Sequence, residues 1–223
     1  NAGYAMTTGN LNLCIGSYAG DTLTTGVRNT AVGHYALTEE DGNGYNVAIG
    51  YAALQNQNAG TDAYNVGMGY NAGYSITTST HSVLIGGHAG DNITTGAYNI
   101  AIGYHALGTE DANGRNVAIG HQALTTLNAG ADAYNVAVGH QAGYAMTTGI
   151  NNITIGAEAG DAITTGSDNI AMGRQALSAK TIGAGDVAIG HQALQDADGG
   201  DAFNVAVGYR AGRNVTTGIR NIL

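Results

Sequence analysis

The chain of 223 residues has no proline and no tryptophan, and it has one phenylalanine, one cysteine and few charged residues. Because Cys14 is the only cysteine, an internal disulfide is excluded. Seven basic residues stand against sixteen acidic ones, for a net charge of −9, and this shortage of basic residues disfavours nucleic acid as a partner. No apolar run is long enough to span a bilayer, and no stretch has the apolar period of a long helix. We therefore expect neither membrane insertion nor long helices.

Glycine is abundant instead, and twelve of the 37 glycines occupy the same place in a repeated phrase. Its clearest copy is Asn-Val-Ala-Ile-Gly-His-Gln-Ala-Leu at residues 116–124. The repeat glycines are Gly16, Gly33, Gly50, Gly69, Gly86, Gly103, Gly120, Gly139, Gly156, Gly173, Gly190 and Gly208. They are separated by 17 to 19 residues. A fixed period of this length is typical of a solenoid, in which each repeat forms one rung.

A second period of four repeats, or 70 residues, lies above the single repeat. In each block, the residues four positions after the repeat glycines read Gly, Leu, Leu, Gly. We predict an all-β fold: a parallel β-solenoid, of β-roll or β-helix type, with about twelve rungs of 17–19 residues. One domain, 1–223, would hold three four-rung blocks, 12–81, 82–151 and 152–220. Since both ends fall inside a repeat, the pattern predicts a slice of a longer fibre.

Each phrase contains a short alternation such as Val47-Ala48-Ile49. A strand sends alternate side chains to opposite faces, so we expect the β-branched pair to fill a narrow core and the alanine to point outward. An outward face restricted to small apolar residues indicates close approach by another backbone. This predicts a homotrimer, with end-to-end stacking as a further self-contact. The predicted oligomer interface consists of Ala48, Ala101, Ala118, Ala137, Ala171, Ala188 and Ala206.

Asparagine opens ten of the twelve complete phrases, with Ser82 and Asp186 as the exceptions. Stacked in register, these side chains are expected to hydrogen-bond from rung to rung, as asparagine ladders do in cross-β stacks. Ten copies of one residue favour a structural role over a catalytic one.

The repeats resemble those of two families. The Asn-x-Ala-Ile-Gly element is similar to repeats in the heads of trimeric autotransporter adhesins, which are left-handed parallel β-rolls assembled as trimers. The fuller phrase at 99–107, Asn-Ile-Ala-Ile-Gly-Tyr-His-Ala-Leu, resembles repeats of bacteriophage tail-fibre proteins, which often include Thr-Thr-Gly. Seven Thr-Thr-Gly or Thr-Thr-Ser stretches in this chain fit that pattern.

The resemblance covers the entire chain, and it implies a structural rod that holds a receptor-binding tip away from a particle or cell. Such a rod belongs to a virion tail fibre or to an extracellular or cell-surface location. A bacterial trimeric adhesin or an extracellular filament is the alternative. The partners expected are further copies of the chain and a cell-surface glycan or protein receptor.

The residue after the repeat glycine is tyrosine or histidine in eight of the twelve repeats. Rings on a rigid surface suit sugar stacking, although packing in turns or between chains would explain the same row. The candidate glycan- or receptor-binding residues are Tyr51, Tyr70, Tyr104, His121, His140, His191 and Tyr209.

No catalytic site is predicted, and the chain is not expected to be an enzyme. Glu39, Glu40 and Asp41 are adjacent on a turn, so they lack the fixed separation of a glycosidase acid pair. The Asp196–Asp201 loop has the alternating carboxylates of a calcium loop, but its counterparts in the other blocks keep one acid each. No cysteine or carboxylate repeats beside the histidines, so we expect no metal and no cofactor. A tailspike-type polysaccharide hydrolase is the remaining alternative, and it would need a groove with paired carboxylates.

Overall fold

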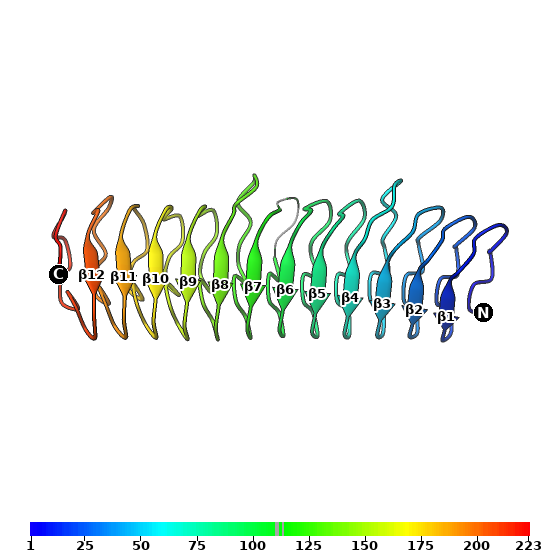
Figure 1. Ribbon diagram of the computed structural model, residues 1–223, viewed down its shortest axis with the longest axis horizontal. Helices are drawn as coiled ribbons and strands as arrows, with labels where there is room; N and C mark the ends of the chain where they lie inside the picture. The colour runs from blue at the N-terminus through cyan, green and yellow to red at the C-terminus, as the bar shows by residue number, and fades with distance from the viewer. Residues whose placement is uncertain (110–111, 113) are drawn as a thin grey trace. The chain divides into compact units, whose positions relative to one another are not determined.

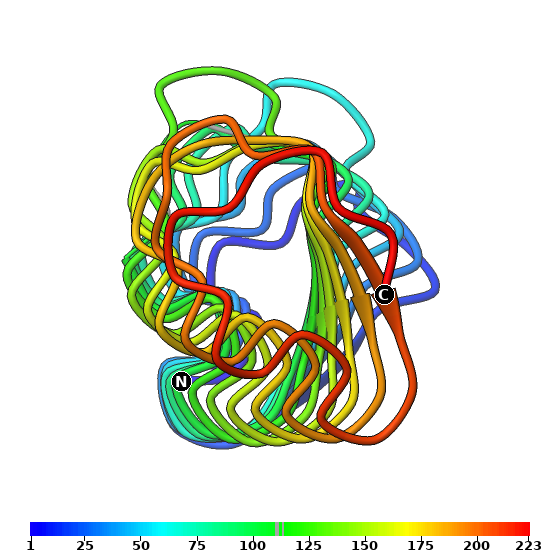
Figure 2. The ribbon, with the colours of Figure 1, turned by 90° about the vertical axis from the view of Figure 1, so that its left-hand side faces the viewer.

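The computed structural model describes residues 1–109, 112 and 114–223, so the acidic residues Glu110 and Asp111 of the loop at 108–114 lie outside the described part. The described residues form twelve short strands, which follow one another in sequence order in a parallel sheet (Figure 1). Each rung closes one coil around an interior (Figure 2). The prediction of an all-β parallel solenoid with one strand per repeat is confirmed. Among the described residues, no helix has the length and apolarity needed to cross a membrane.

The chain divides into two compact units, called here the first unit, Asn1–Gly114, and the second unit, Arg115–Leu223. The strands of the first unit are β1 (Leu13–Ile15), β2 (Thr30–Val32), β3 (Val47–Ile49), β4 (Val66–Met68), β5 (Val83–Ile85) and β6 (Ile100–Ile102). Those of the second unit are β7 (Val117–Ile119), β8 (Val136–Val138), β9 (Ile153–Ile155), β10 (Ile170–Met172), β11 (Val187–Ile189) and β12 (Val205–Val207). Within each unit, every strand pairs with the next one with equivalent residues side by side.

The strands point their middle residue into the coil and the two flanking residues outward. Ala48 is fully buried, whereas Val47 and Ile49 on either side of it are partly exposed. The same order holds in the other strands except β1, where Cys14 is half-buried. The prediction that the β-branched pairs fill the core and the alanines face outward is therefore wrong. Period-2 alternation identifies two faces but does not say which one is inside.

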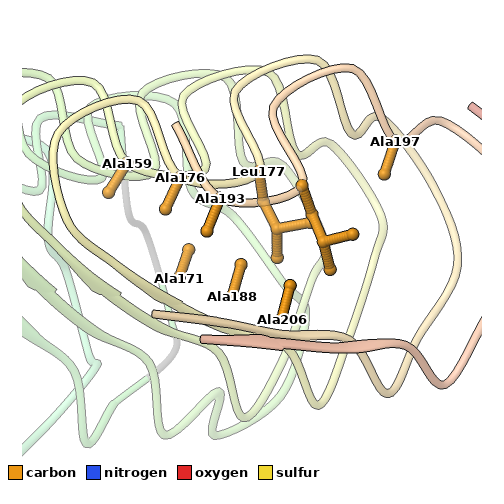
Figure 3. Packing of buried hydrophobic residues seen from close by; sticks show 9 residues of the cluster. Ala159, Ala171, Ala176, Leu177, Ala188, Ala193, Ala197 and Ala206 are labelled. Atoms are coloured by element: carbon orange, nitrogen blue, oxygen red, sulfur yellow. The ribbon is translucent and has the colours of Figure 1, made fainter. Parts of the chain in front are cut away.

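The interior of the coil explains this orientation, because the middle residue of the strand faces the buried turn residues across a narrow space. In Figure 3, Ala171, Ala188 and Ala206 of β10–β12 face the turn alanines and Leu177. Two β-branched side chains per strand would overfill that space. The seven alanines predicted to form an oligomer interface, Ala48, Ala101, Ala118, Ala137, Ala171, Ala188 and Ala206, are all 0% exposed. They offer no surface to a second chain, so an interface made by these side chains is wrong as well.

The 70-residue period is a pattern of core volume. Where the fourth residue after the repeat glycine is leucine, as at Leu107, that side chain fills the coil. Where it is glycine, as at Gly90, a large residue three positions later fills the coil instead. A Cβ at Gly90 would lie 2.8 Å from Cδ1 of Ile93 and 2.7 Å from Cδ2 of Leu84. Leu23, Ile76, Met146 and Ile163 are the corresponding residues in other glycine rungs.

The predicted rung-to-rung ladder of asparagines is confirmed, and its donors are backbone amides. The N–H of Asn46 donates to Oδ1 of Asn29 (2.9 Å), and the N–H of Asn65 donates to Oδ1 of Asn46 (3.0 Å). Nδ2 of Asn65 donates in turn to the carbonyl of Ser79 (2.7 Å). The ladder therefore satisfies buried backbone groups where each strand begins, which a simple stack of amide side chains would not do.

Three leucine rungs carry a buried polar residue seven positions after the repeat glycine: Glu40, Gln57 and Lys180. Each contacts the ladder residue that opens the next phrase of the chain: Asn46, Asn65 and Asp186 respectively. Lys180 Nζ lies 2.8 Å from Oδ2 of Asp186, and it donates to the carbonyls of Gly199 (2.9 Å) and Gly200 (3.0 Å). The one aspartate in the ladder is thus matched by a buried lysine, so the two charges neutralise each other.

Lys180→Leu is expected to lower the free energy of unfolding by about 3–5 kcal/mol, because it leaves Asp186 buried without a counter-charge. The double variant Lys180→Leu/Asp186→Asn is expected to return to within about 1 kcal/mol of the wild type. It recreates the arrangement of Leu127 and Asn135 in another leucine rung. Urea unfolding followed by circular dichroism measures both. A double variant as unstable as the single one would contradict the pairing.

Candidate functional site

The outward face of each rung is built from four positions spaced two residues apart. In the rung of β3 these are Tyr45, Val47, Ile49 and Tyr51. The inner two positions lie in the strand and the outer two lie just before and just after it. The sheet therefore presents two apolar rows along the middle, with a row of rings on either side of them in the first unit.

We call the two middle rows the apolar face. In the first unit it consists of Leu13, Ile15, Thr30, Val32, Val47, Ile49, Val66, Met68, Val83, Ile85, Ile100 and Ile102. In the second unit it consists of Val117, Ile119, Val136, Val138, Ile153, Ile155, Ile170, Met172, Val187, Ile189, Val205 and Val207. All of these side chains are partly or fully exposed, and Thr30 is the one polar residue among them. An exposed face of this kind normally belongs to an interface.

The position before the ladder asparagine carries a row of stacked side chains in the first unit: Arg28, Tyr45, Tyr64, His81 and Tyr98. The Arg28 guanidinium lies 5.3 Å from the Tyr45 ring centre, and the three following ring pairs have centroids 4.7–5.3 Å apart. Their planes lie within 28° of parallel. Each inner ring therefore has neighbours over both of its faces. Sequence reasoning missed this closed stack, although rings and arginine recur there at the repeat period.

The opposite side of the apolar face carries what we call the ring band of the first unit. It contains eight described rings: Tyr18, His34, Tyr35, Tyr51, Tyr70, His88, Tyr104 and His105. Adjacent members have centroids 4.0–6.3 Å apart from the first rung to the sixth. Three of the predicted binding residues, Tyr51, Tyr70 and Tyr104, belong to it. The other five rings include four from the next position along the turn, which the sequence analysis did not single out.

The rings of the band have two orientations. Tyr51 and Tyr70 lie 12° from parallel, with centroids 5.2 Å apart, but Tyr51 is turned by 77° from His34 and by 88° from Tyr35. His34 and Tyr35 are neighbours in one rung, and their rings stack at 4.0 Å. Tyr51 and Tyr70 are 44% and 54% exposed, about as much as Tyr64 and Tyr98 of the closed stack, at 47% and 51%.

In the second unit the predicted binding residues form two separate pairs. His121 stacks on His140 at 5.2 Å, and His191 stacks on Tyr209 at 5.4 Å. Ala157 and Arg174 occupy the same position on the rungs between them. A polar ladder of hydrogen bonds runs alongside, through Glu158, Gln175, Gln192 and Arg210. The structure thus brings the predicted row together in the first unit and interrupts it in the second.

The turn carboxylates do not form a catalytic pair. Glu40 points into the coil and is fully buried, with Oε1 accepting from the N–H of Asn43 and Oε2 accepting from Nδ2 of Asn46, whereas Glu39 and Asp41 are exposed. Burial raises the pKa of the Glu40 carboxyl, and the hydrogen bonds from Asn43 oppose that rise only in part. A buried carboxyl enclosed by its own rung is not accessible to a substrate.

The Asp196–Asp201 loop uses one of its carboxylates, that of Asp198, in contacts within the chain. Asp198 Oδ1 accepts from the N–H of Thr181 (2.9 Å) and from its hydroxyl (2.7 Å). These hydrogen bonds lower the pKa of the Asp198 carboxyl. Across the described residues, no three or more histidine, cysteine, aspartate or glutamate side chains gather as metal ligands would. The loop is therefore held to the neighbouring rung by protein contacts.

Glu40→Gln is expected to stabilise the protein at neutral pH. Because the folded-state pKa of Glu40 is raised, its stabilising contribution is complete below the unfolded pKa of about 4.3 and is lost as the pH rises through the folded value. The variant should therefore have a higher urea midpoint at pH 7, with no such gain at pH 4. Gln57 already fills the equivalent position of the next rung. Glu39→Gln, at an exposed position, is the control, and an equal gain in both variants would contradict the assignment to burial.

Comparison with protein-family models and with curated proteins finds no match for this sequence, and comparison with solved structures finds none for its fold.

Proposed function

We propose that the chain is a structural rod segment of a homotrimeric fibre, belonging to a phage tail or to a cell surface, that holds a receptor-binding tip at a distance. The observation that carries this proposal is the apolar face. Soluble monomers rarely expose a continuous patch of valine and isoleucine, and a sheet face so rich in apolar residues is typical of a surface that packs on another.

The geometry of the apolar face favours further copies of the same chain as its partner. Its side chains repeat once per rung, with equivalent residues side by side within each unit. A rotation axis parallel to these rows would bring the same rungs of each copy to one level, so that every apolar side chain meets an equivalent one. The apolar face carries no formal charge on any strand, so like charges do not oppose this contact.

The number three comes from the resemblance of the repeats to phage tail-fibre and trimeric autotransporter sequences. Stacked rungs with a polar ladder inside each unit supply the stiffness that a rod needs. A bacterial trimeric adhesin or an extracellular filament would use the same contact. A polysaccharide hydrolase gains no support, since the one acidic turn that sequence analysis considered holds Glu40 inside the coil.

Sedimentation velocity at micromolar concentration is expected to give a particle of three times the chain mass of 22.4 kDa. Ile49→Asp/Ile85→Asp on the apolar face should dissociate it into monomers, because each trimer would bury six unpaired carboxylates. Thr25→Asp/Thr95→Asp, at exposed positions on a turn, should leave the trimer intact. Circular dichroism checks that both variants remain folded. A monodisperse wild-type monomer, or dissociation by the turn variant as well, would contradict the proposal.

A further inference from the structure

We infer that the two margins of the apolar face bind each other between copies of the chain, each rung against the same rung of its neighbour, so that Asp168 of one copy pairs with Arg174 of the next. The leading margin is the position directly before the ladder residue, and the trailing margin is the position directly after the repeat glycine. In the rung of β10 these positions are Asp168 and Arg174. The inference rests on the proposed self-association and adds to it the residues that meet.

The direction of neighbouring copies decides which margins come together. Around a rotation axis parallel to the rows, the leading margin of each copy lies beside the trailing margin of the next, with equivalent rungs at one level. In copies that run in opposite directions, each margin would lie beside its own kind instead. The two arrangements therefore require different matches between the side chains of a single rung.

Aromatic residues of the two margins occur on the same rungs. Tyr64 and Tyr70 lie on either side of β4, and Phe203 and Tyr209 lie on either side of β12. All four rings are about half exposed or more in a single chain. Aromatic pairs attract one another beyond the effect of the area that they bury. Parallel copies would thus cover the exposed rings of one margin with rings of the other.

The charged residues of the margins are matched in the same way. The rung of β10 is the one that has an aspartate, glutamate, lysine or arginine at both margin positions, and the two charges are opposite. Parallel copies bring Asp168 and Arg174 to one level, where opposite charges favour contact and fix the register. Copies in opposite directions would not bring these two residues together.

The two residues do not satisfy each other within one chain. They lie at opposite ends of a largely extended segment, roughly 15–20 Å apart. Asp168 Oδ1 accepts from Nδ2 of Asn151 (3.1 Å), and neither Asp168 nor Arg174 belongs to an ion pair in the described part of the chain. Both side chains are exposed. Each is therefore accessible to a neighbouring copy.

Cross-linking tests this contact in the full chain, in a Cys14→Ala background that removes the one native thiol. Asp168→Cys/Arg174→Cys should react with a short bismaleimide to give covalent products of two and three chains, and none larger, on a denaturing gel. Either substitution alone should give no such product, because like margins do not meet. Asp168→Cys/Ala179→Cys is the matched control and should give none either, since Ala179 is exposed and lies about half a coil beyond the middle of β10.

Charge reversal gives an independent measurement by sedimentation equilibrium. Asp168→Arg and Arg174→Asp each place like charges at every contact between copies, so each should weaken association about tenfold. The double variant Asp168→Arg/Arg174→Asp re-forms the pair with its signs exchanged and should return to within about threefold of the wild type. Single variants that associate as tightly as the wild type, or a double variant as weak as the single ones, would overturn the inference.

Sedimentation of the wild type separates this inference from the proposed fibre, and circular dichroism checks that each variant remains folded. A wild-type monomer would overturn both proposals. If the wild type is a trimer but Asp168→Cys/Arg174→Cys gives no cross-link, or a single-cysteine variant gives products of two chains, the fibre stands and the contact between opposite margins is wrong.

Discussion

The narrow interior of the coil is the constraint on which the rest of the structure depends. One or two large side chains, such as Leu124 and Leu127, fill a rung, so most strands contribute only a small residue to the interior. This puts Ala118 inside and turns Val117 and Ile119 outward. It also explains why Gly90 is accompanied by Ile93 and Leu84, which replace the missing leucine volume. The repeat period and the four-rung period are both consequences of filling a thin cylinder without gaps or overlap.

The same constraint produces the surface chemistry. A globular domain hides its branched apolar residues, but a coil this thin has no room for two of them per strand, and they remain on the outside as a flat face. Soluble monomers rarely leave such a face uncovered, and this links the internal packing to the proposed trimer. Rows of rings can form beside this face because each rung repeats the same turn. Outward aromatic side chains at equivalent positions of successive rungs therefore stack on one another.

The sequence predicts the β-solenoid fold correctly, but it predicts wrongly which side chains of each strand point into the coil. The glycine spacing, the twelve strands and the asparagine ladder follow from periodicity alone, and the structure confirms them. The predicted orientation of the strand side chains is wrong, because either face of an alternating strand could point inward. The volume available inside the coil decides between the two orientations. The sequence did contain a signal of this limited volume. Gly20 and Leu37 both stand four positions after a repeat glycine, so that position alternates between no side chain and a large one. The sequence predicts only part of the ring band, namely the residue directly after each repeat glycine. The next position along the turn supplies Tyr18, Tyr35, His88 and His105, and these were not predicted.

The buried polar residues address a difficulty created by the repetition itself. Rungs with nearly the same sequence could pair one step out of place at little cost, because apolar residues would still meet apolar residues. Lys180 makes such a shift costly, because its Nζ donates to the carbonyls of Gly199 and Gly200, which lie 19 and 20 residues further along the chain. Its contact with Asp186 is local in the chain, so it neutralises the lysine in any register. The contacts of Glu40 with Asn43 and Asn46 are local in the same way. The two hydrogen bonds of Lys180 to the next rung, and not the ion pair, therefore favour one register.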